Sequence, residues 1–130
     1  MVWADDAGVI LNPTLAYDQL IGGAAQGLGQ ALMEALQYDE HGQLITGSLM
    51  DYAIPRAQDM PNIDVYSLHT ASTTNPLGAK GVGEAGCIGV PAALMNAVRD
   101  ALFGYLGKEP PELSFPLTSE TIWRAIGFRG

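Results

Sequence analysis

The 130-residue sequence is poor in residue types on which several common functions depend. It has one cysteine, Cys87, and two histidines, His41 and His69, so a disulfide scaffold is excluded and a zinc cluster lacks ligands at any usual spacing. The chain has six basic and 14 acidic residues, and its net charge is −8. This charge argues against binding to nucleic-acid phosphates or to an anionic membrane surface. We therefore expect no metal ligated by side chains, no nucleic acid and no membrane as partners.

Long hydrophobic runs and targeting signals are also missing. No apolar run approaches the roughly 18 residues of a membrane span. The start, MVWADDAGVI, lacks the basic and apolar regions of a signal peptide. These features predict a cytoplasmic protein. The composition, with 48% apolar and 15% charged residues, is typical of a folded chain, and the length suits a single domain over residues 1–130.

Local patterns predict an α+β fold with a small mixed or antiparallel sheet and about three helices. Helical spacing of apolar residues predicts helices over residues 13–36, 91–105 and 118–126. Alternation and turn residues predict extended segments within residues 1–10, 36–46 and 62–70. Asn12 is a good N-cap for the first helix, and Pro13 suits its first position.

Four glycines lie inside the first predicted helix, at positions 22, 23, 27 and 29. Each interior glycine costs ~1 kcal/mol relative to alanine, so packing or ligand contact must offset the loss. One interpretation is close packing against a strand, where only glycine fits. The other is that the backbone approaches a ligand together with Gln19 and Gln26, which lie on nearly the same face. The residues alone leave both open.

A second glycine-rich stretch, NPLGAKGVGEAGCIGVPAA, covers residues 75–93 and holds five glycines within twelve residues around one acid, Glu84. The bare dinucleotide-binding pattern fits residues 81–86, but a polar segment containing a proline precedes it instead of a buried strand, and an acid there would repel phosphate. We reject that interpretation. The stretch is a loop whose amides can approach a ligand. Glu84 is either a solvated loop residue or a carboxylate held over a ligand as a base.

The segment GAKGVGEAGCIGVPAALMNAVRDAL resembles the C-terminal signature of the molybdenum hydroxylases. This family includes xanthine dehydrogenase, aldehyde oxidase and the large subunit of aerobic carbon monoxide dehydrogenase. Residues 5–61 resemble the preceding segment of bacterial members, and FPLTSETIWRAI resembles their closing helix, so the resemblance covers essentially residues 5–126. It implies a fragment of the family's molybdenum-binding domain, with the upstream family domains absent.

The resemblance also implies roles for particular residues. Glu84 matches the family's catalytic glutamate, a general base beside the molybdenum in a hydroxylation that takes its oxygen from water. Gln19 matches a glutamine beside the metal. The segment that passes close to the cofactor is matched by Lys80, Gly81, Val82 and Gly83. The implied cofactor is a molybdopterin-type molybdenum cofactor, with a cytosine dinucleotide form as one option, and no side chain is expected as a metal ligand.

Family catalytic subunits are several times longer than this chain, and this leaves two hypotheses. In the first, the chain is the C-terminal part of an oxidoreductase's molybdenum subunit, acting on an aldehyde, an N-heterocycle or a CO-like substrate. Its partners are then the rest of that subunit and the iron–sulfur and FAD subunits. We expect the isolated chain to be inactive and to lose cofactor, because such a pocket needs several converging surfaces. In the second, it is a catalytically silent assembly domain that forms homo-oligomers through Trp3, Trp123 and Phe128.

Overall fold

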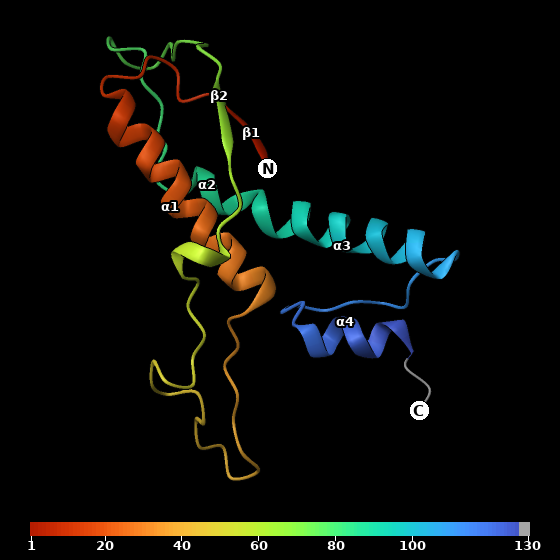
Figure 1. The fold of residues 1–130 in the computed structure, drawn as a ribbon. Coiled ribbons are helices and arrows are strands. Elements are labelled where there is room, and N and C mark those ends of the chain that lie inside the picture. The colour runs from red at the N-terminus through yellow and green to blue at the C-terminus, as the bar shows by residue number, and fades with distance from the viewer. Residues whose placement is uncertain (128–130) are drawn as a thin grey trace.

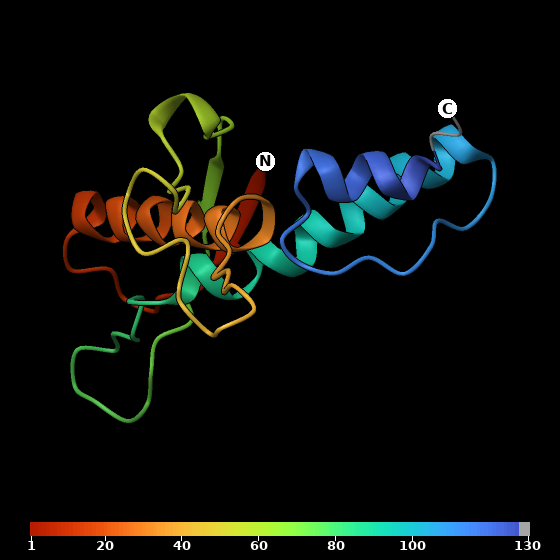
Figure 2. The ribbon, with the colours of Figure 1, turned by 90° about the horizontal axis from the view of Figure 1, so that it is seen from below.

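The computed structural model describes residues 1–127, which form four α-helices, one 3-10 helix and two strands. In chain order these elements are β1 (Val2–Asp5), α1 (Pro13–Leu32), η1 (Ala57–Asp59), β2 (Asp64–Ser67), α2 (Ala85–Ile88), α3 (Val90–Leu106) and α4 (Ser119–Ile126). The strand pair lies near α1, and α3 and α4 form an arm that extends away from it (Figures 1 and 2). The three expected helices are present, and the short α2 adds a fourth.

The two strands pair in parallel, from Val2 opposite Asp64 to Asp5 opposite Ser67. The expected α+β class is confirmed, but the sheet is not the mixed or antiparallel one that we predicted. A parallel pair requires a long crossover between its strands. Here the crossover carries α1 and the loop that follows it. The sequence patterns located both strands without indicating this connection.

Helix α1 begins where the sequence predicts. Asn12 accepts a hydrogen bond from the amide of Leu15 through its side chain, at 3.1 Å, and Pro13 occupies the first helical position. The helix ends at Leu32, four residues before the predicted end. The Glu34 carboxylate instead accepts a 2.7 Å hydrogen bond from the Tyr52 hydroxyl. This contact joins the end of the helix to the following loop.

The extended structure predicted within residues 36–46 is reduced to a turn. The amide of Asp39 donates to the carbonyl of Gln43 at 2.9 Å, and Gly42 adopts a φ of 79°. Tyr38 and Leu44 form one isolated antiparallel bridge, and no strand is assigned in this part of the described chain. Residues 36–46 therefore form a loop that ends in a tight turn.

Two of the α1 glycines allow a very close approach of α2 and α3. A Cβ added to Gly23 would lie 3.0 Å from the Cα of Gly86, and one added to Gly27 would lie 2.9 Å from the Cβ of Val90. The packing interpretation is thus correct at these two positions, although the neighbour is a helix rather than a strand. The contact continues into the core, where Ala24 and Leu28 pack with Val90.

The three residues expected to form an oligomer surface differ in their environments. Trp3 packs against the core cluster and is only partly exposed, so it is not a free surface residue. The side chain of Trp123 is 52% exposed on α4. Phe128 lies outside the described residues.

None of the helices within residues 1–127 combines the length and the apolar character that a membrane span needs.

Candidate functional site

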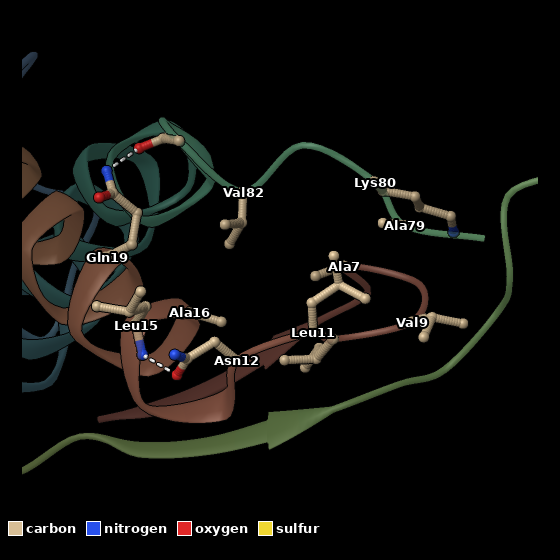
Figure 3. A pocket seen from close by; sticks show the side chains of 12 residues that line it. Ala7, Val9, Leu11, Asn12, Leu15, Ala16, Gln19, Ala79, Lys80 and Val82 are labelled. Atoms are coloured by element: carbon tan, nitrogen blue, oxygen red, sulfur yellow. Dashed lines mark hydrogen bonds between the residues drawn. The ribbon is translucent and has the colours of Figure 1, made fainter. Parts of the chain in front are cut away.

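A cavity of about 370 Å³ lies between the start of α1 and the glycine-rich loop (Figure 3). Its other wall is the turn that follows β1. Among the residues predicted to bind cofactor, four line this cavity: Gln19, Lys80, Val82 and Gly83. The structure therefore brings together most of a set that is split in sequence between a helix and a distant loop. Gly81 and Glu84 are next to lining residues in the chain but do not line the cavity.

The contact that joins the two parts of the site is a hydrogen bond from Gln19 to Gly83. The side-chain Nε2 donates to the Gly83 carbonyl at 2.6 Å, across 64 positions in the chain (Figure 3). The amide oxygen of Gln19 has no hydrogen-bond donor among residues 1–127, and the side chain is exposed. Gln19 therefore holds the loop with one end of its amide and leaves the other end available.

Glu84 follows Gly83 directly and occupies the N-cap position of α2. Its side chain makes no capping hydrogen bond, and no ion pair within the described chain involves it. The Glu84 carbonyl accepts from the amide of Cys87 at 3.0 Å and from its thiol at 3.2 Å. The backbone is thus fixed while the exposed carboxylate remains unpaired among the described residues.

The side chain of Lys80 binds Asp6, which sequence reasoning missed. Lys80 Nζ lies 3.0 Å from Asp6 Oδ2, and the two positions are 74 residues apart. Asp6 Oδ1 accepts from the amides of Gly8 at 3.0 Å and Thr70 at 3.1 Å. Hydrogen bonds from Lys80 and then Thr70 hold the pKa of the Asp6 carboxyl well below its usual range. Nothing in the local pattern ADDAG indicates which of its two acids has a distant partner.

The lowered pKa of Asp6 predicts a specific loss of stability in acid. A carboxyl whose pKa is lowered by folding stabilises the fold above its ordinary value of 3.8, and this contribution falls as pH drops below that value. Between about pH 5 and about pH 3, wild type should therefore lose more stability than Asp6→Asn. Urea unfolding midpoints of both chains at the two pH values measure this. A gap between the midpoints that stays constant or widens in acid would contradict the assignment.

Comparison with known proteins identifies the class to which this arrangement belongs. Residues 1–61 match the family model described as "Molybdopterin cofactor-binding domain". The chain is 49% identical over 98 residues to the 6-hydroxypseudooxynicotine dehydrogenase complex subunit gamma of Paenarthrobacter nicotinovorans, covering 75% of this chain and 12% of that protein. It is 43% identical over 121 residues to the nicotine 6-hydroxylase large subunit of the same organism, covering 93% of this chain and 14% of that protein.

A solved structure agrees in fold over almost the whole chain. Quinoline 2-oxidoreductase from Pseudomonas putida 86 superposes with a TM-score of 0.88 and 42% identity, over 98% of this chain and 16% of that one. The chain thus belongs to the molybdenum hydroxylase family. It corresponds to part of the family's molybdopterin-binding domain. It spans between 12% and 16% of the length of these three relatives.

The residues present fit a molybdopterin cofactor as one wall of its site. Gly81 and Gly83 have open space where a side chain would begin, with no atom within 4 Å of an added Cβ. Their exposed backbone, the free amide oxygen of Gln19 and the unpaired carboxylate of Glu84 lie along a short length of loop and helix. A pterin cofactor needs surfaces on several sides. The start of α1 and the glycine-rich loop form one such surface.

Proposed function

We propose that this chain supplies the base and part of the cofactor wall of a molybdenum hydroxylase. The observation that carries the proposal is the 2.6 Å hydrogen bond from Gln19 to Gly83, which places the proposed cofactor-binding glutamine beside the residue that precedes Glu84. When bound, the molybdenum cofactor supplies the two-electron redox chemistry of the hydroxylation. The residues of this chain position the loop, orient the cofactor and remove a proton from the water-derived group.

Each residue has a defined part in the proposed site. Glu84 accepts a proton at its carboxylate from the water-derived group that enters the substrate. Gln19 orients the cofactor through its free amide oxygen and holds the loop through its nitrogen. Val82 and the backbone of Gly81 and Gly83 form the wall that the cofactor passes. Lys80 contributes its backbone and alkyl chain to that wall, because its ammonium is bound to Asp6.

The exposed apolar residues of the chain support the proposal of partner polypeptides. Large apolar side chains are widely exposed, including Met50 at 96%, Leu49 at 80% and Ile88 at 76%. Large apolar residues exposed in this number favour another polypeptide that covers them. We propose that the rest of a molybdenum subunit covers them, with iron–sulfur and FAD subunits completing the electron-transfer chain. One relative's name describes it as a subunit of a dehydrogenase complex, which agrees with a multi-subunit enzyme.

The substrate and the form of the cofactor are part of the same proposal. The relatives named for nicotine and quinoline act on compounds that contain an N-heteroaromatic ring, so an N-heterocycle is the favoured substrate class, ahead of an aldehyde or a CO-like molecule. The cytosine dinucleotide form of the cofactor stays a prediction, as do a cytoplasmic location and homo-oligomer formation.

Loss of the Gln19 side chain is expected to lower cofactor loading without unfolding α1. Alanine is the better helix former, so Gln19→Ala should leave the helix intact. We expect molybdenum content to fall several-fold when the variant is co-expressed with the remaining segments of a molybdenum subunit. Gln26→Ala is the matched control, since Gln26 is exposed on the same helix and does not line the cavity. Equal molybdenum content in both variants, measured by mass spectrometry, would contradict the role of Gln19.

The same co-expression tests the function as a whole. The chain alone should purify without molybdenum, and the complex with the remaining segments should contain nearly one molybdenum per chain. A complex that assembles fully but contains no molybdenum would favour the alternative, a silent assembly domain.

A further inference from the structure

We infer that Asp6 is a positioning residue for Glu84, acting through an anchor that fixes the start of the glycine-rich loop. This inference rests on the proposed function, because it assigns Asp6 a part in placing the proposed base. Asp6 itself does not line the cavity. Its effect would reach the site through the backbone of residues 78–83.

The anchor joins three segments that are far apart in the sequence. Asp6 Oδ2 binds Lys80 Nζ at the start of the loop, and Asp6 Oδ1 accepts from the amide of Thr70, just after β2. Oδ1 also accepts from the amide of Gly8, whose φ of 66° lets the chain turn back on the carboxylate. The side chain of Asp6 is 26% exposed, so the ion pair is partly shielded from water.

Backbone hydrogen bonds extend the anchor along the same edge of the loop. The amide of Lys80 donates to the carbonyl of Ala7 at 2.9 Å, and the amide of Val9 donates to the carbonyl of Gly78 at 3.0 Å. Gly8 and Ala79 form an antiparallel bridge between these two bonds. The turn after β1 therefore fixes residues 78–80 from one side, with Asp6 as the charged group at its end.

The other end of the loop is fixed separately by Gln19, which holds the Gly83 carbonyl. Between the two anchors lie Gly81 and Val82, and an added Cβ on Gly81 would meet nothing within 4 Å. The carbonyl of Val82 accepts one backbone hydrogen bond, from the amide of Ala85 at 3.3 Å. The middle of the segment therefore has few contacts that could hold it when either end is released. Glu84 lies only four residues after Lys80, and the second anchor between them is a single hydrogen bond from an exposed side chain. Release of the first anchor would therefore broaden the range of positions that the Glu84 carboxylate samples.

Amide exchange on the chain itself tests the anchor without cofactor. Asp6→Asn keeps an oxygen that can accept from Gly8 and Thr70, but it removes the charge that holds Lys80. We expect the amide of Lys80 to exchange about tenfold faster, with the amides of α1 unchanged. Asp5→Asn is the matched control, since the neighbouring carboxylate makes no side-chain hydrogen bond or ion pair within the described residues. If Asp6→Asn fails to fold, Lys80→Met breaks the same ion pair from the loop side.

Turnover in the assembled enzyme tests whether the anchor acts through Glu84. Asp6→Asn should lower kcat roughly three- to tenfold with KM and molybdenum content unchanged, a loss expected of a misplaced base. In a Glu84→Gln background the same substitution should have no further effect. An equal loss in both backgrounds, or unchanged exchange at Lys80, would overturn the inference. Normal turnover of Glu84→Gln would instead overturn the proposed function, and the exchange result would still decide whether the anchor exists.

Discussion

Replacement of Glu84 by glutamine is expected to lower turnover of the assembled enzyme by about 10²-fold or more, because the amide cannot accept the proton that a general base removes. Glutamine has nearly the same shape, so the loop and α2 should keep their positions. The carboxylate caps no helix and forms no ion pair among the described residues, so no structural contact is lost. The expected effect is therefore on kcat, with molybdenum content and thermal stability unchanged.

Two further variants sharpen this test. Glu84→Asp keeps the carboxylate but withdraws it by one methylene, so its turnover should fall between those of wild type and Glu84→Gln. Glu112→Gln is the matched control, since Glu112 is also exposed and lies in the loop that leads to α4. Steady-state kinetics of the three variants measure the effect. A Glu84→Gln enzyme within a few-fold of wild type would show that Glu84 is not the base.

Replacement of Gly86 by alanine is expected to lower the free energy of unfolding by roughly 2–3 kcal/mol. The added Cβ would press on the backbone of α1, at the carbonyl of Leu20 and at the amide of Ala24, 2.8 Å away. Backbone atoms cannot rotate out of the way, so the two helices must separate. The free-energy cost of this overpacking exceeds the small gain in helix propensity that alanine provides.

Gly22→Ala is the control for this prediction. Gly22 is exposed inside α1, and an added Cβ would meet no atom within 4 Å. The same substitution should therefore raise the free energy of unfolding, by up to ~1 kcal/mol. Urea unfolding of the chain measures both variants. If Gly86→Ala is as stable as Gly22→Ala, the close contact between α1 and α2 does not exist in solution.

Local features of the sequence were reliable where they act over a few residues. Asn12 and Pro13 located the start of α1. The helix predicted over residues 118–126 agrees with α4, whose first turn Thr118 caps by accepting from the amide of Thr121. Of the two interpretations of the helical glycines, close packing holds at Gly23 and Gly27, but an added Cβ at Gly22 would meet nothing within 4 Å. These signals depend on the geometry of a few neighbouring residues, so the local sequence is enough to reveal them.

Contacts between distant segments could not be predicted in the same way. The parallel pairing of β1 with β2 depends on the length and course of the crossover rather than on either strand's residues. The ion pair of Asp6 with Lys80 and the hydrogen bond of Gln19 to Gly83 join positions 74 and 64 apart. The family resemblance pointed to Gln19 and Glu84, but it carried no signal for Asp6.

The glycine contact between α1 and α2 separates the placement of the base from the choice of substrate in the proposed enzyme. Glu84 is the N-cap residue of α2, and α2 rests on α1 by backbone contact at Gly23 and Gly86, with no side chain between them. The position of the backbone at Glu84 is therefore set in part by this backbone contact, and not by a side chain that substitution could exchange. Substrate preference would then change through the walls that other segments supply, while the packing of α2 on α1 stays the same. Enzymes built on this fragment could diversify their substrates without rebuilding their chemistry.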